Sequence, residues 1–83
     1  MQSDIIRKIN IRYARVMQIL NNSDLSPGAL AQFNSSYSSI CHAAPEVLVD
    51  KLELFALICI QHQKELVDKG LDDKLRNIIS GTE

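Results

Sequence analysis

Pro45 is the residue that most constrains how this chain can fold. It separates two stretches in which apolar residues recur at helical spacing, and a proline disfavours helical geometry at the preceding residue, here Ala44. Pro45 also lacks the amide hydrogen that a continuing helix needs, although the first turn of a new helix tolerates it. We therefore predict that one helix ends just before Pro45, that the chain reverses, and that another helix starts there.

Comparable signals predict the other helix ends. Ser26 offers a capping hydroxyl directly before Pro27, a pair that is typical of a helix start. Gly70 is a natural left-handed stop, and Asp72 suits the positive end of a following helix. Between these signals, apolar residues recur at three- and four-residue spacing. The predicted helices cover residues 4–21, 27–43, 46–69 and 72–80.

These elements predict the fold class. No alternating β-pattern interrupts the helical spacing, and 46% hydrophobic with 23% charged residues is ordinary for a soluble globular protein. We expect one domain over residues 1–83. Its expected architecture is all-α: a small antiparallel helical bundle of three long helices plus a short C-terminal helix.

Charge and apolar runs bear on the location. The formal net charge of −1 gives no global attraction to nucleic acid or anionic lipid. The longest apolar run, residues 54–60, is much shorter than the roughly 18 residues that a membrane span needs. The start MQSDIIRKIN lacks a signal-peptide pattern, and two cysteines without a secretory context indicate reduced thiols. We expect a cytoplasmic protein with no membrane span.

Both cysteines and both histidines fall in one window of the sequence, which raises the question of a metal site. Cys41 and His42 point about 100° apart on a helix and cannot act as a ligand pair. The reversal at Pro45 places Cys41 and Cys59 at levels about 15 Å apart, too far for a disulfide or a shared zinc ion. We expect two buried cysteines that act as small core residues, a half-buried His62, a solvated His42 and no metal.

Catalytic motifs are not apparent. The sequence contains no nucleophile elbow, no phosphate-binding glycine loop and no H-E-x-x-H pattern. Asp72 and Asp73 are neighbours at a predicted helix start, where the helix dipole explains them. We expect that the protein is not an enzyme, with no catalytic residue and no cofactor.

Basic residues concentrate on the first predicted helix. Arg7, Lys8, Arg12 and Arg15 stand against one acid, Asp4, which gives a local charge of +3. Lys8, Arg12 and Arg15 lie within about 60° of one another on a helix. This basic face is the candidate contact for nucleic acid, because backbone phosphates attract such clusters.

The stretch LSPGALAQFNSSYSSI resembles a helix-turn-helix, with Leu30-Ala31 in place of the packed Leu-Ala pair of that family. The resemblance covers some twenty residues and implies a recognition helix over residues 36–44. Ser35 replaces the usual turn glycine, and the implied recognition helix has no Arg, Lys, Gln or Asn. The alternative function is therefore a nucleic-acid-binding transcriptional regulator that uses the basic first helix and this degenerate motif.

The third predicted helix is apolar on nearly every side. Leu54 and Leu57 point away from its main apolar stripe, and Ile11 and Ile19 lie outside the stripe of the first helix. Such a helix is either the centre of a bundle or buried by a partner. Burial of each large side chain contributes about 1.5–3 kcal/mol. Either the fourth helix covers these residues, or another protein does.

We favour the partner. The predicted contact residues are Ile11, Ile19, Leu54 and Leu57, flanked by Arg12 and Arg15. Residues 46–73 hold seven acids and three bases, a local −4 that complements the +3 of the first helix and suits an antiparallel dimer. The sequence thus predicts a non-enzymatic protein–protein interaction module, such as a small regulator, adaptor or secretion chaperone, that binds another protein or forms a homodimer.

Overall fold

A computed structural model describes the backbone of residues 2–81 and the side chains of residues 4–81. Its helices are α1 (Gln2–Asn21), α2 (Pro27–Cys41), α3 (Leu48–Gln61), α4 (Gln63–Asp68) and α5 (Asp72–Ser80), with a 3-10 turn η1 (Pro45–Val47). The described residues contain no strand, so the predicted all-α class is confirmed. None of the described helices is both long and apolar enough to cross a bilayer. Residues 1, 82 and 83 of the predicted domain lie outside the described residues.

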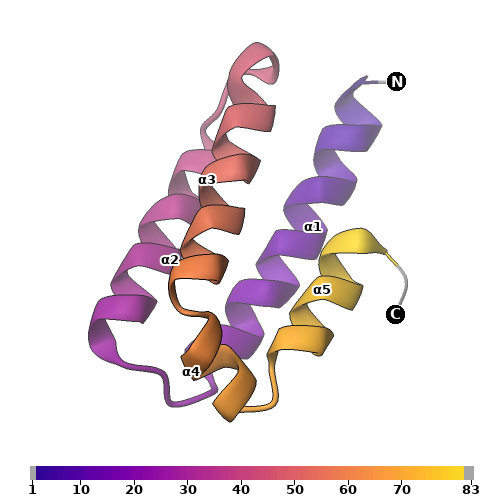
Figure 1. The fold of residues 1–83 in the computed structure, drawn as a ribbon. Coiled ribbons are helices and arrows are strands. Elements are labelled where there is room, and N and C mark those ends of the chain that lie inside the picture. The colour runs from indigo at the N-terminus through magenta and orange to yellow at the C-terminus, as the bar shows by residue number, and fades with distance from the viewer. Residues whose placement is uncertain (1, 82–83) are drawn as a thin grey trace.

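Helical structure begins at Pro27 and again at Pro45, as the sequence predicted. The Ser26 Oγ accepts a hydrogen bond from the Ala29 amide at 3.4 Å, and Pro27 is the first residue of α2. Ala44 is extended, with φ −68° and ψ 152°, as a residue before proline should be. The chain reverses through η1, so that α3 returns alongside α2 (Figure 1).

The predicted helix over residues 46–69 is wrong as a continuous element, because the structure divides it into η1, α3 and α4. The break falls at His62, whose φ of −107° and ψ of 21° leave the helical region. The His62 Nε2 donates a hydrogen bond to the Gln32 Oε1, and its ring centroid lies 6.0 Å from that of Phe33. These contacts with α2 accompany a break at which the sequence has neither proline nor glycine.

The redirected α4 closes one end of the molecule. The Glu65 carboxylate accepts hydrogen bonds from the Ser26 amide at 2.7 Å and from the Ser26 hydroxyl at 3.0 Å. Leu66 is buried. Gly70 then adopts the predicted left-handed conformation, φ +72°, and the Leu71 amide donates to the Leu66 carbonyl at 2.8 Å. These interactions bind α4 to the loop before α2 and start α5 in a new direction.

Three aromatic rings from three helices meet at the centre of the core. The centroids of Tyr13 on α1 and Phe55 on α3 are 5.0 Å apart, with the planes at 88°. The Phe33 ring on α2 lies 5.4 Å from Phe55. The edge-to-face contact of Tyr13 with Phe55 adds to the gain from burial. No polar or charged residue among those described is buried, so the core depends on apolar packing.

The short α5 leaves part of the bundle without a fourth helix. α1 has 20 residues and α5 has nine, which correspond to about 30 Å and 14 Å. Figure 1 shows α5 beside the C-terminal half of α1, whereas the N-terminal half of α1 diverges from α3. The space between α3 and the α1–α5 pair is therefore covered unevenly.

Candidate functional site

Leu54 and Leu57, two of the predicted contact residues, are exposed to 50% and 58%. They line a shallow hollow between α3 and α2, where α2 offers small residues such as Ala31 and Ser35. α5 does not cover them. We call this surface the α2–α3 hollow. Exposed leucines beside small side chains allow another helix to approach closely.

Ile11 and Ile19 lie in different surroundings. Ile11 is 53% exposed on the outer face of α1, in a hollow that Arg7 and Asn10 also line. Ile19 is half-buried and packs against the core. The structure therefore places these two residues, on α1, apart from the α2–α3 hollow.

Three of the four basic residues of α1 lie around the C-terminal end of α5. Lys8, Arg12 and Arg15 line one shallow hollow together with Gly81. The Arg12 guanidinium lies so close to Gly81 that a Cβ on this glycine would be 2.9 Å from Nη2. A cation at the carbonyl end of a helix is favourable. Arg12 thus has a structural contact within the chain, in addition to any contact with a partner.

The helix-turn-helix expected from the resemblance is absent. α2 runs as one helix from Pro27 to Cys41, through Ser35 and Ser36, where that motif needs its turn. Serine at these positions stays helical because Phe33 and Ile40 are both buried against neighbouring helices. The segment is therefore a single packed helix.

The two thiols differ in their surroundings. Cys41, the last residue of α2, is exposed and Cys59 is only partly buried, so the expectation of two buried cysteines is wrong. Cys59 is half-buried, and desolvation, followed by the nearby charge of Asp72, raises the pKa of its thiol to about 11. His42 is exposed and His62 half-buried, as predicted. Residues 4–81 contain no group of three or more His, Cys, Asp or Glu placed to hold a metal ion.

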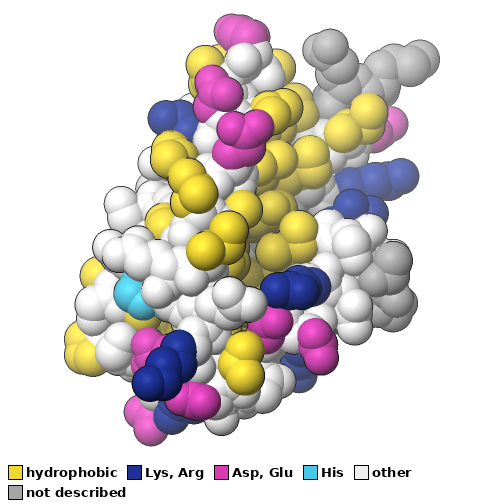
Figure 2. Space-filling view, in the orientation of Figure 1, with side chains coloured by type: hydrophobic (Ala, Val, Ile, Leu, Met, Phe, Trp, Pro, Cys, Tyr) yellow, Lys and Arg dark blue, Asp and Glu magenta, His cyan; other side chains and the backbone are white. Residues whose placement is uncertain are grey.

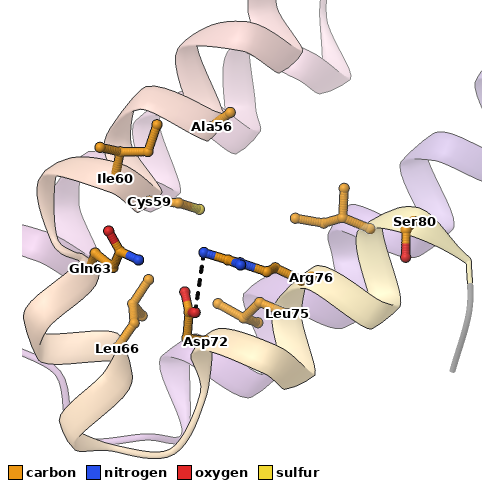
Figure 3. Close-up of a pocket in the computed structure, with 10 residues that line it drawn as sticks. Ala56, Cys59, Ile60, Gln63, Leu66, Asp72, Leu75, Arg76 and Ser80 are labelled. Carbon is orange, nitrogen blue, oxygen red and sulfur yellow. Dashed lines mark ion pairs between the residues drawn. The ribbon is translucent and has the colours of Figure 1, made fainter.

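An apolar groove between α3 and α5 was not predicted. It has a volume of about 460 Å³. Figure 3 shows the Cys59 side chain pointing into it from α3, and Arg76 extending across it from α5. The Arg76 guanidinium pairs with Asp72 at 3.3 Å where it reaches across the groove. Apart from this ion pair the lining is mainly apolar, with Ala56, Ile60, Leu75 and Ile79 among its residues.

A second hollow extends the first along α3. It has a volume of about 210 Å³ and lies between Ile5 and Ile9 of α1 and Val49 and Leu52 of α3. Leu52 and Ala56, four residues apart, lie on one face of α3, which connects the two hollows. We call their combination the long groove. Figure 2 shows hydrophobic side chains gathered in this channel between α3 and the α1–α5 pair.

The two rims of the long groove carry opposite charges. On α3, the exposed Glu53 lies about 40° around the helix from Val49. On α1, Arg12 and Lys8 lie about 20° and 60° from Ile5. Figure 2 shows acidic side chains along the α3 edge, and basic side chains with one acidic neighbour along the α1 edge.

The sequence did not reveal the long groove, because apolar spacing does not show which neighbour covers a helix. Ile5, Val49 and Ile60 are 60%, 63% and 65% exposed. Periodicity assigned Val49 and Ile60 to a widened apolar arc of the third helix, but it did not indicate which neighbour would cover that arc. The short length of the last helix, residues 72–80, was the signal that its neighbours would be left partly uncovered.

Comparison with known proteins gives no relative: the chain matches no family model, and no curated protein or solved structure is significantly similar to it.

Proposed function

We propose that this chain is a non-enzymatic protein–protein interaction module that binds through the apolar surface of α3. Its concrete forms are a small regulator, an adaptor or a secretion chaperone. The observation that carries the proposal is the exposure of apolar residues on both edges of α3. Leu54 and Leu57 are half or more exposed in the α2–α3 hollow, and Val49 and Ile60 even more so at the long groove.

The energetics support this interpretation. Full burial of one such side chain contributes about 1.5–3 kcal/mol, so four of them offer a partner a large apolar contact. Exposed apolar patches of this kind mark interaction sites in soluble proteins. A homodimer through the α2–α3 hollow is one form of the proposal, and a complex with another protein is the other.

The proposal is tested with three proteins: the unchanged chain, Leu57→Glu and Val67→Glu. Val67 is 54% exposed on α4 and serves as a matched control outside both surfaces. The solution mass is measured by light scattering, and cross-linked partners are captured from the native host. We expect Leu57→Glu to reduce self-association or partner capture, because it places a charge in the α2–α3 hollow, whereas Val67→Glu leaves both unchanged.

Thermal unfolding checks that both variants remain folded. A chain that stays monomeric, and whose captured partners are the same with Leu57→Glu as without it, would contradict binding through this edge of α3. If Ile60→Glu were equally without effect on partners, the proposed function would be withdrawn.

A further inference from the structure

The long groove has the dimensions of a helix-binding site. Val49, Leu52, Ala56 and Ile60 follow one another along its α3 wall at spacings of three and four residues. Val49 and Ile60 are eleven positions apart, which corresponds to about 16 Å, or three helical turns. Ala56, the smallest of the four, lies in the middle of the wall and leaves room for a side chain from outside.

The opposite wall is also mainly apolar, apart from the Arg76–Asp72 ion pair on α5. Ile5 and Ile9 of α1 form its first part, and Ile79 and Leu75 of α5 form its second. Both walls are helices, so a third helix with an apolar stripe can lie between them and make ridge-and-groove contacts with each. This is the arrangement in which amphipathic helices are recognised by grooves.

The charges of the rims select the flanks of such a helix. Glu53 on the α3 rim attracts Lys or Arg, and Lys8 and Arg12 on the α1 rim attract Asp or Glu. A helix that is basic along one flank and acidic along the other satisfies both rims at once. A helix with two flanks of the same sign satisfies one rim and is repelled by the other.

The same charges disfavour a second copy as the occupant. Five of the eight large apolar residues that the described chain exposes lie on η1 and α3. A second copy would therefore have to insert its α3 into the groove. In a two-fold contact centred on the wall from Val49 to Ile60, Glu53 lies near the symmetry axis. It therefore lies close to the Glu53 of the copy. Like charges at such a contact oppose it.

We infer that the long groove is the docking site for an amphipathic helix of a different protein, about three turns long, basic on the flank that faces Glu53 and acidic on the flank that faces Lys8 and Arg12. The inference rests on the proposed function, because it presupposes that the chain binds another protein. It adds the surface, the secondary structure and the charge pattern of the segment that is bound.

Three synthetic peptides with the same leucine stripe test the inference. One has a basic and an acidic flank, one has two basic flanks, and one has two acidic flanks. Binding is followed by fluorescence anisotropy at low ionic strength, where exposed charges are least screened. We expect the mixed peptide to bind about 3- to 10-fold more tightly than the other two, the range typical of a few exposed charge pairs.

Charge reversal on one rim should change the preferred peptide. Glu53→Lys makes both rims basic, so the peptide with two acidic flanks should become the tightest ligand. Lys8→Glu offsets the charge of Arg12 on the α1 rim, so the peptide with two basic flanks should gain affinity relative to the mixed peptide. Asp68→Lys and Lys64→Glu, exposed positions on α4, change the net charge equally and should leave the original order in place. Circular dichroism verifies the helical content of every variant.

Two further measurements locate the peptide. Ala56→Trp fills the groove without altering charge and should abolish the binding of all three peptides. Bound peptide should also slow the alkylation of Cys59, which faces the groove, and leave the exposed Cys41 unaffected (Figure 3).

The inference is overturned if the order of affinities does not depend on the rims, or if the α4 controls change it as much as the rim variants do. A dimer that protects Cys59 without any peptide would also overturn it, because a second copy would then occupy the groove. In each of these cases a loss of partners with Leu57→Glu would still support the proposed function, so the two failures are distinguishable.

Discussion

The two halves of α1 have similar apolar patterns and different surroundings. In the C-terminal half, Val16 and Leu20 are completely buried. In the N-terminal half, Ile5 is 60% exposed and Ile9 is partly buried. The difference arises because the nine-residue α5 lies beside only one of the halves (Figure 1). The comparison teaches that a periodic apolar stripe shows which side of a helix avoids water, but not which neighbour covers it.

Truncation of one aliphatic residue in each half of α1 should give the largest difference in the free energy of unfolding. Leu20→Ala removes a completely buried side chain and should lower the free energy of unfolding by about 2–5 kcal/mol, because it leaves a cavity. Ile5→Ala should change it by about 0.5 kcal/mol or less, as is usual at exposed positions. Urea unfolding, followed by circular dichroism, measures both. Equal losses in the two variants would mean that the N-terminal half is as well covered as the other.

Substitution of Gly81, at the end of α5 beside Arg12, should change the free energy of unfolding by a smaller amount. Gly81 has a φ of +77°, where any other L-residue is strained, so Gly81→Ala should cost about 1–2 kcal/mol. Gly28→Ala is the matched control. It meets open space in a helix, so it should stabilise the protein by roughly 0.4–1 kcal/mol. A destabilised Gly28→Ala and an unaffected Gly81→Ala would contradict the described ends of α2 and α5.

The contact between α4 and the loop before α2 should depend on pH. The hydrogen bonds from the Ser26 amide and hydroxyl hold the pKa of Glu65 below its ordinary value, with His62 and Lys69 contributing. This stabilisation is fully present above the ordinary carboxyl pKa and is lost as the pH falls through the lowered one. Glu65→Gln should therefore flatten the acid limb of the stability profile.

Urea midpoints between pH 3 and pH 7 measure this slope. Glu53→Gln, at an exposed position on α3, is the matched control for the loss of one carboxylate outside the α4 contact. An unaltered acid limb in Glu65→Gln would show that the carboxylate does not hold α4 in place.

Local signals were sufficient for most of the helix ends. Proline, a capping serine and glycine act on their own neighbours, so Pro27, Pro45 and Gly70 could be interpreted without knowledge of the rest of the chain. The all-α class followed from the same local evidence together with the spacing of apolar residues.

Contacts between distant residues were not predictable in this way. The break at His62 accompanies one hydrogen bond to Gln32 on α2, 30 residues away, and one ring contact with Phe33. The exposure of Cys41 depends on where α2 stops, and the position of Arg12 depends on α5. For the candidate site, the sequence identified Leu54 and Leu57 as surplus apolar residues. It did not show that Ile5 and Ile60 border one groove, because that depends on how far α5 reaches.

The central claim, that the long groove accepts an amphipathic helix, is tested most directly by the δ1-methyl NMR signals of the isoleucines. Addition of the mixed-flank peptide should shift the signals of Ile5, Ile9, Ile60 and Ile79, which line the groove. The signals of Ile11 on the outer face of α1 and of Ile40 in the core should remain in place. Shifts confined to Ile58 in the α2–α3 hollow, or to Ile11, would contradict the claim.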